Sequence, residues 1–197
     1  MKETKRKTQE DKRALVLQKA LELFADKGFH STTTAEIAKA AGIAKGSLFN
    51  YFENKEQLLR TIVFDTMLQM AELIDPNHDG VVTEEEFFGM IRNTFEWVGK
   101  KREFLLLYFS IVSQPTVYNL LCAELWEILD PYLKQLGAFF RQSGFEDPET
   151  EVRYFLAMLD GMSINYAMDP GNFPIEKIEK KITLYYKYQL QEINQEH

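Results

Sequence analysis

Hydrophobic residues recur every three to four positions along most of this chain, which is the period of an amphipathic α-helix. The clearest stripe lies in a helix expected at about residues 10–26 and consists of Leu17, Ala20, Leu21 and Phe24. Further helices are expected at about residues 34–41, from residue 45, and at 55–74, 84–99, 102–113, 116–143, 148–168 and 175–194. Because the helical period dominates throughout, we predict an all-α fold.

Polar residues and glycine mark several of the expected helix ends. Gly28 is a candidate left-handed cap after the first helix,. Thr33 precedes Glu36 by three positions, which is a capping-box pattern, and Asn54 can cap the long helix that follows it,. In the segment 116–143, Pro131 either kinks the helix or opens a new one with the preceding Asp130 as its cap.

Residues 31–60 combine a capped short helix, a tight turn at residues 41–43 and a second short helix from about Lys45. Leu48 and Phe52 give the second helix a narrow buried edge, and its other side is polar. A DNA-reading helix-turn-helix needs this geometry, because its second helix lies in the major groove while the first crosses the phosphate backbone. The pattern therefore predicts a three-helix DNA-binding head.

The charge distribution agrees with a head and a separate body. The formal net charge is −7, but residues 1–60 hold twelve Lys and Arg against eight Asp and Glu, whereas residues 61–197 hold eleven against twenty-two. An extended basic tail, KETKRKTQEDKR, is expected before the first helix; it either faces DNA or is a solvated N-terminus. We expect a DNA-binding domain at residues 1–60 and a second domain at 61–197.

Cysteine content and hydropathy indicate the compartment. Cys122 is the only cysteine, so no intrachain disulfide can form and a reducing environment is expected,. The N-terminus lacks the apolar core of a signal peptide, and no apolar run reaches the length of about 18 residues that a membrane span needs. We expect a cytoplasmic protein that does not enter a membrane.

From Thr33 onward the chain follows the pattern T-x-x-x-I-A-x-x-A-G-I-x-K-G-S-L-F-x-Y-F-x-x-K-x-x-L-L. This pattern resembles the tetracycline-repressor (TetR) family of bacterial regulators, strongly over about residues 10–60 and more weakly beyond. The resemblance implies an all-α homodimer with small DNA-binding heads on a larger domain that binds a ligand and dimerises. It further implies a repressor of a near-palindromic operator, released by a small apolar effector. We expect no required cofactor.

The resemblance also implies which residues meet DNA. Candidates for base edges are Lys45, Gly46, Ser47 and Asn50, where Lys45 suits guanine and Asn50 suits adenine. Thr33, Tyr51 and Lys55 are expected to hold phosphates. Two positions depart from the family: Ala44 lacks the usual capping hydroxyl, and Phe49 replaces a tyrosine. Phe49 keeps its ring either for DNA or for packing against the first helix.

Residues 75–86, DPNHDGVVTEEE, fit the loop of an EF-hand calcium site at every defined position,. The candidate ligands are Asp75, Asn77, Asp79, the Val81 carbonyl, Thr83 and Glu86. The alternative needs no metal, because Thr83 and Glu86 also form a capping box and the loop residues are those that turns favour. A calcium-responsive binding module is therefore the alternative to a ligand-released repressor.

The second domain offers candidates for an effector pocket and a dimer interface. Aromatic and methionine side chains that either line a pocket or fill the core are Trp97, Phe104, Tyr108, Trp126, Phe140, Met158 and Met162,. Asp160 lies within an apolar run and faces a cationic ligand, a partner across the dimer, or solvent. Helices 148–168 and 175–194 carry more apolar surface than one chain needs to bury, so we expect them to form an intersubunit four-helix bundle.

The remaining motifs give no sign of catalysis. His30, His78 and His197 stand far apart, without the spacing of metal ligands, and the chain has neither a glycine-rich phosphate loop nor a nucleophile motif,. We therefore expect a binding protein.

Overall fold

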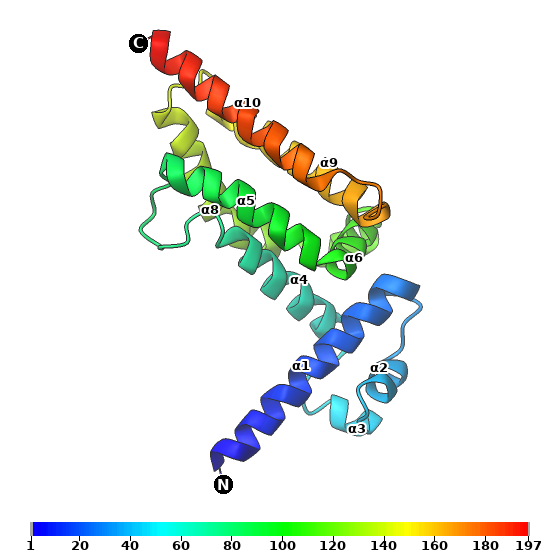
Figure 1. The fold of residues 1–197 in the computed structure, drawn as a ribbon. Coiled ribbons are helices and arrows are strands. Elements are labelled where there is room, and N and C mark those ends of the chain that lie inside the picture. The colour runs from blue at the N-terminus through cyan, green and yellow to red at the C-terminus, as the bar shows by residue number, and fades with distance from the viewer. Residues whose placement is uncertain (1, 197) are drawn as a thin grey trace.

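The computed structural model describes the backbone of residues 2–196 and the side chains of residues 9–195, and every regular element in that range is a helix (Figure 1). The helices are α1 (Lys2–Lys27), α2 (Thr34–Ala40), α3 (Lys45–Leu48), α4 (Lys55–Ala71), α5 (Glu84–Lys100), α6 (Arg102–Val112), α7 (Pro115–Tyr118), α8 (Cys122–Gln142), α9 (Pro148–Met168) and α10 (Ile175–Glu196). Helices α1 to α3 form a head at one end, α5 to α10 form a larger body, and α4 runs between them. The predicted all-α fold is confirmed.

Helix α1 is longer than the sequence pattern indicated. The expected extended basic tail is wrong, because the backbone is helical from Lys2 onward. The physical reason is composition: this segment is built mainly of Lys, Arg, Glu and Gln, which are good helix formers, and contains neither glycine nor proline,. The N-terminal end of α1 therefore projects beyond α2 and α3 as a rod (Figure 1). Its other end closes as predicted, with Gly28 at φ 81° donating its N–H to the Phe24 carbonyl at 3.0 Å.

The head is held together by a small core. Val16, Ala20 and Phe24 of α1 are fully buried there, and they lie in one core with Ile37, Ala38, Leu48, Phe52, Leu58 and Leu59. The loop into α2 is fixed by Thr32, whose hydroxyl donates to the carbonyls of Leu23 and Gly28. The predicted caps at Thr33 and Asn54 are both present.

The body contains one helix break that the sequence pattern did not indicate. The expected helix 116–143 is divided into α7 and α8 by a turn at residues 119–121, stabilised by hydrogen bonds from Leu120 and Leu121 to carbonyls three residues earlier. Pro131, the expected breaker, lies inside α8 without ending it. It is exposed to solvent, so water can reach the carbonyl that lacks its amide partner,.

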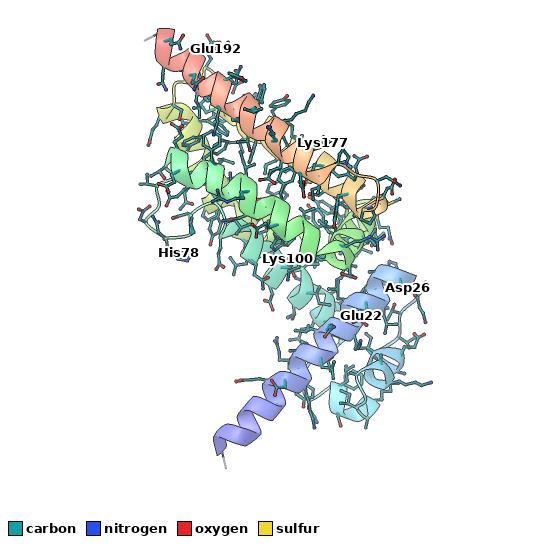
Figure 2. All side chains as sticks on the ribbon, viewed as in Figure 1. Glu22, Asp26, His78, Lys100, Lys177 and Glu192 are labelled. Carbon is teal, nitrogen blue, oxygen red and sulfur yellow. The ribbon has the colours of Figure 1, made fainter. Side chains whose placement is uncertain are left out.

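The second core lies between α5, α8, α9 and α10, where α10 packs on α5 and α9 (Figures 1 and 2). At its centre Phe87 contacts several other rings, those of Phe88, Phe139, Phe140, Phe155 and Tyr186, with centroids 4.7–5.5 Å apart. Tyr186 is fully buried and donates its hydroxyl proton to Glu151 at 2.7 Å. This pair ties α10 to α9 beneath the body's surface.

Helix α4 belongs to both halves of the molecule. Its first turns contribute Leu58 and Leu59 to the head core, which also takes in residues of α6, α7 and α8. Arg60 donates to the Leu120 carbonyl at 2.6 Å and forms an ion pair with Glu124. Because α4 is continuous across residue 60, the boundary between the two expected domains falls inside a helix.

Candidate DNA-binding surface and ligand cavity

Helices α2 and α3 are joined by the short turn that a helix-turn-helix requires. Gly42 adopts φ 66°, a left-handed conformation that glycine accepts without strain,. Ile43 donates its N–H to the Ala38 carbonyl at 3.0 Å, which brings the chain back across the end of α2. Leu48 is then fully buried and anchors α3 against the head core. The opposite face of α3 points to solvent.

That solvent face carries the residues predicted to meet base edges. Lys45, Gly46 and Asn50 are exposed, and Ser47 is half-buried. Among the described residues, neither the Lys45 ammonium nor the Asn50 side-chain amide has a hydrogen-bonding partner or an ion pair. Their donors are therefore free to bind an external acceptor.

The two departures from the family pattern are visible in the geometry. Ala44 is the N-cap of α3 and offers no side-chain hydrogen bond to it. Phe49 is 46% exposed, so its ring is not part of the head core and faces outward beside Asn50. Tyr51 is half-buried against the head core. The outward-facing ring of Phe49 is thus available for contact with a partner.

Lys55 does not present its ammonium to solvent as the predicted phosphate contact requires. Its Nζ donates to the carbonyls of Phe29, His30 and Thr32 at 2.8, 3.3 and 2.9 Å, and lies 4.5 Å from the centroid of the Phe29 ring. All three donors of the ammonium group are used. We therefore correct the predicted role: in this structure Lys55 fastens the loop between α1 and α2.

Thr33 and Glu36 likewise serve the start of α2. The Thr33 hydroxyl accepts from the Glu36 N–H, and a Glu36 carboxylate oxygen accepts from the Thr33 N–H at 2.9 Å. The Lys27 ammonium donates to the other carboxylate oxygen at 2.9 Å, and this hydrogen bond, together with those from Thr33, lowers the pKa of Glu36 to about 2. The side chain predicted to bind phosphate is thus part of a capping box.

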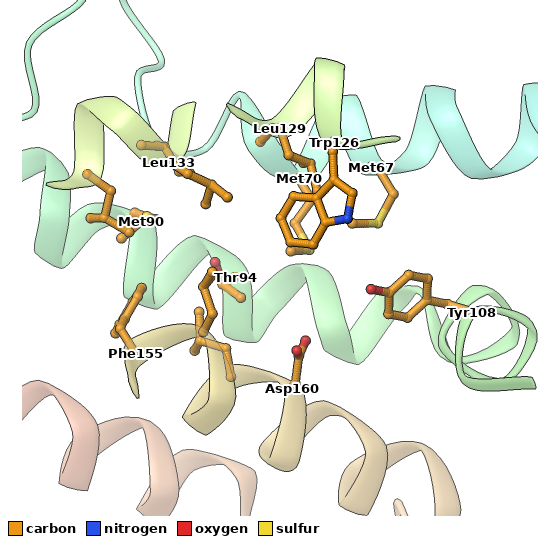
Figure 3. Close-up of a pocket in the computed structure, with 15 residues that line it drawn as sticks. Met67, Met70, Met90, Thr94, Tyr108, Trp126, Leu129, Leu133, Phe155 and Asp160 are labelled. Carbon is orange, nitrogen blue, oxygen red and sulfur yellow. The ribbon is translucent and has the colours of Figure 1, made fainter. Parts of the chain in front are cut away.

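The body contains an apolar cavity of about 110 Å³ between α4, α5, α6, α8 and α9 (Figure 3). Its lining residues are Met67, Met70, Ala71, Ile74, Met90, Thr94, Tyr108, Trp126, Leu129, Leu133, Leu136, Phe155, Leu156, Leu159 and Asp160. A smaller cavity of about 30 Å³ adjoins it and is lined in addition by Trp97, Phe104, Leu105, Phe109 and Ser163. Thr94 and Asp160 line both cavities, so the two share part of their wall.

The structure divides the predicted pocket residues into two groups. Tyr108 and Trp126 line the larger cavity, and Trp97 and Phe104 line the smaller one. The other three pack with the second core instead: Phe140 is fully buried there, Met162 is 5% exposed, and Met158 packs at its edge. The Phe140 ring contacts Phe87 of α5 and Tyr186 of α10 there. The sequence pattern missed the cavity wall contributed by α4, Met67 and Met70, since methionine in an apolar stripe has the same pattern in either place.

The loop between α4 and α5 brings most of the predicted calcium ligands together (His78 is labelled in Figure 2). Asp75 is buried and accepts from the N–H groups of Asp79 and Gly80 and from the side chain of Gln135. The Asn77 amide donates to both the Asp79 and the Glu86 carboxylates.

The capping interpretation of the same loop is realised in full. Glu86 accepts from the Thr83 N–H at 2.9 Å, Thr83 accepts from the Glu86 N–H, and α5 begins one residue after Thr83. Val81 is exposed. Among the described side chains, those of residues 9–195, no three His, Cys, Asp or Glu are grouped so that they could hold a metal ion. Calcium binding at this loop stays a prediction.

The chain is similar to known bacterial regulatory proteins. Residues 16–62 match the family model of bacterial regulatory proteins, tetR family. The chain is 28% identical over 105 residues to the biofilm operon icaADBC negative transcriptional regulator IcaR of Staphylococcus epidermidis, covering 53% of this chain and 55% of that one. It is 29% identical over 135 residues to the transcriptional repressor KstR2 of Rhodococcus jostii, covering 66% and 60%. The chain thus spans roughly half the length of the curated relatives it matches.

The solved structures extend the likeness to the whole fold. The transcriptional regulator FadR from Bacillus subtilis, in complex with stearoyl-CoA, superposes with a TM-score of 0.71 at 22% identity, over 86% of this chain and 95% of that one. At this identity the likeness shows a shared fold. Within residues 2–196, no helix is both long enough and apolar enough to cross a membrane.

Proposed function

We propose that the chain is a homodimeric transcriptional repressor of the tetR family that a small ligand releases from its operator, because residues 16–62 match that family's model and its relatives include transcriptional repressors. The observation that carries the proposal is the exposed surface of α3 and of the turn after it, where the side chains of Lys45 and Asn50 have no partner among the described residues. Polar groups left free on a short, well-anchored helix suit direct reading of base edges in the major groove.

Base reading is assigned to Lys45, Ser47 and Asn50, with Gly46 allowing close approach to the groove. A Lys on guanine O6 and N7, or an Asn on adenine N6 and N7, contributes about 1–3 kcal/mol of discrimination. Phosphate contacts are assigned to Tyr51 and to the N–H groups at the start of α2. The ring of Phe49 lies beside them and adds apolar contact.

Dimerisation is assigned to the outer faces of α9 and α10. These helices expose large apolar side chains that a single chain leaves uncovered, namely Tyr154, Ile164, Met168, Leu184, Tyr185 and Tyr188. Met168 is 71% exposed and Tyr188 is 60% exposed. Two copies that pack these faces together form a four-helix bundle and place the two heads side by side on a near-palindrome.

The cavity of Figure 3 is the proposed effector site. It lies against α4, which leads directly into the head, and against α6, which packs on α1. A ligand that binds better to a conformation with the wrong head spacing shifts the dimer away from DNA by at most its preference for that conformation.

The test is selection of bound DNA from a random-sequence library, followed by anisotropy titrations of the enriched sequence. We expect a near-palindrome with half-sites about one helical turn apart. The variant Lys45→Ala with Asn50→Ala should lose at least about tenfold in affinity for that sequence. Lys100→Ala, an exposed lysine on the body, is the matched control and should bind normally. Unchanged binding by the double variant, or no enriched sequence, refutes the proposal.

The oligomer is tested separately by light scattering. Wild type should elute as a dimer, and Tyr188→Glu with Met168→Glu should elute as a folded monomer, because charges then meet across an apolar interface. A wild-type monomer at micromolar concentration contradicts the assignment of the interface.

A further inference from the structure

The cavity of Figure 3 is apolar on nearly every side but contains one charged group. Among the described residues its wall has no Lys, Arg or His, and Asp160 is its single acid. The remaining wall consists of aliphatic, methionine and aromatic side chains with the hydroxyls of Thr94, Tyr108 and Ser163. The electrostatic character of this space is therefore set by one carboxylate.

That carboxylate has no partner of its own. Asp160 is an exposed residue of α9 whose side chain points into the cavity toward Thr94 and Tyr108 (Figure 3). Among the described residues it forms no ion pair and accepts no side-chain hydrogen bond. Partial burial raises its pKa, and burial together with the nearby Asp160 charge raises the pKa of Tyr108 to about 12, so Tyr108 stays a neutral hydroxyl. Because solvent reaches this carboxylate, it needs no protein partner, and it is open to a cation that enters the cavity.

A second polar group in the same space is also unsatisfied. The indole N–H of Trp97, in the wall of the smaller cavity, is buried and has no acceptor. Buried donors are almost always paired in folded proteins, so an orphan donor in a cavity wall marks a place where a ligand atom or water completes the bonding. Trp97 and Asp160 are thus two unpaired polar groups in the walls of the adjoining cavities.

The volume limits the size of the ligand. The two adjoining cavities measure about 110 and 30 Å³. Because a cavity of about 150 Å³ in another protein holds a benzene molecule, a space of this size limits the body of the ligand to about one ring. Trp126 and Tyr108 present aromatic groups around it, and aromatic faces attract cations as well as apolar rings,.

We propose that this cavity binds a small organic cation, an ammonium group on a single-ring apolar body, with the Asp160 carboxylate as its counter-ion. The inference rests on the proposed function, because it names the chemical class of the effector at the same site. It separates this chain from its structural neighbour bound to stearoyl-CoA, whose ligand carries a long chain and an anionic head.

The basic groups nearest to the cavity lie outside it. A surface cleft that shares Trp126, Leu133 and Leu156 with the cavity wall also contains Lys134, Arg141 and Arg153. Lys134 is paired with Asp130 and Arg141 is paired with Glu149. If the ligand is an anion instead of a cation, we expect it to bind in this cleft.

The experiment is calorimetric titration of the full chain with three matched compounds, 2-phenylethylammonium, 2-phenylethanol and 3-phenylpropionate. The ammonium compound should bind at least about tenfold more tightly than the other two, as a charge-assisted hydrogen bond predicts. Asp160→Asn should reduce ammonium binding to the level of the alcohol. Asp65→Asn, the same change on an exposed part of α4, should leave it unchanged.

Thermal melts establish that the variant is folded. Because Asp160 is exposed and has no partner among the described residues, Asp160→Asn should melt as wild type does,. Tighter binding of 3-phenylpropionate, lost in Arg153→Gln, overturns the proposal, as does ammonium binding that Asp160→Asn leaves unchanged. If the chain binds its operator but shows no preference for the cation, this inference alone is refuted. If it binds the cation but recognises no DNA, the proposed function is refuted and the cation site stands.

Discussion

Lys55 offers the sharpest test of how the head is built. Replacing it with methionine keeps the length of the side chain and removes the ammonium that donates to the carbonyls of Phe29, His30 and Thr32. A hydrogen bond from a charged donor contributes about 1.5–3 kcal/mol, and the contact with the Phe29 ring adds about 0.5 kcal/mol,. Ordering the lysine costs about 2 kcal/mol of rotamer entropy. With each bond at the low end of its range, Lys55→Met should lose about 3 kcal/mol of unfolding free energy.

For a chain of this length, a loss of that size lowers the melting temperature by about 6–12 °C. The assay is thermal and urea unfolding of Lys55→Met beside Lys45→Met. Lys45 is exposed and has no partner among the described residues, so its variant should melt as wild type does while losing DNA affinity.

The refuting result is the reverse pattern. If Lys55→Met melts normally, but the slope of log affinity against log salt concentration falls by about 0.9, then Lys55 binds a phosphate. The three carbonyl contacts would then contribute nothing measurable to stability.

Three further predictions concern stability. Glu36 has its pKa lowered to about 2 from 4.5, so its contribution is present above pH 4.5 and is lost as pH falls toward 2; Glu36→Gln should remove this part of the acid dependence in urea unfolding curves at stepped pH,. Tyr186→Phe should lose about 1.5 kcal/mol and Tyr186→Ala about 4 kcal/mol in urea unfolding, and a phenylalanine variant as stable as wild type would show that the bond to Glu151 is not stabilising,. Because Glu86 already caps α5, melts of wild type and Glu86→Gln should show no calcium-specific difference; a rise with calcium, absent with magnesium or EDTA and lost in the variant, would establish a calcium site instead,.

Sequence reasoning succeeded where structure depends on neighbours along the chain. The caps at Thr33, Asn54 and Thr83 and the left-handed Gly28 each involve residues within four positions, and the structure contains all of them. The helix-turn-helix follows from the same local rules together with a family pattern.

It failed where distant segments meet. The carbonyls that bind Lys55 lie 23 to 26 residues earlier, and no local pattern connects them to a lysine. Met67 and Phe140 both read as apolar helix positions, yet one lines a cavity and the other fills the core, because that choice depends on how α4 and α8 pack. Apolar residues around the whole circumference of α9 predicted that this helix is buried on two faces. One face is buried in the second core, and the other is exposed in a single chain.

The continuity of α4 has a mechanical consequence. This helix has 17 residues and is therefore about 25 Å long, with head residues at one end and Met67, Met70 and Ala71 in the cavity wall at the other,. Arg60 is hydrogen-bonded to the turn before α8 and ion-paired with Glu124 between those ends. A single rigid element therefore touches the head core, the body and the cavity wall, and a movement of the methionines would be carried along the same helix that the head packs against. Shortening or bending α4 should change the response without altering either binding surface.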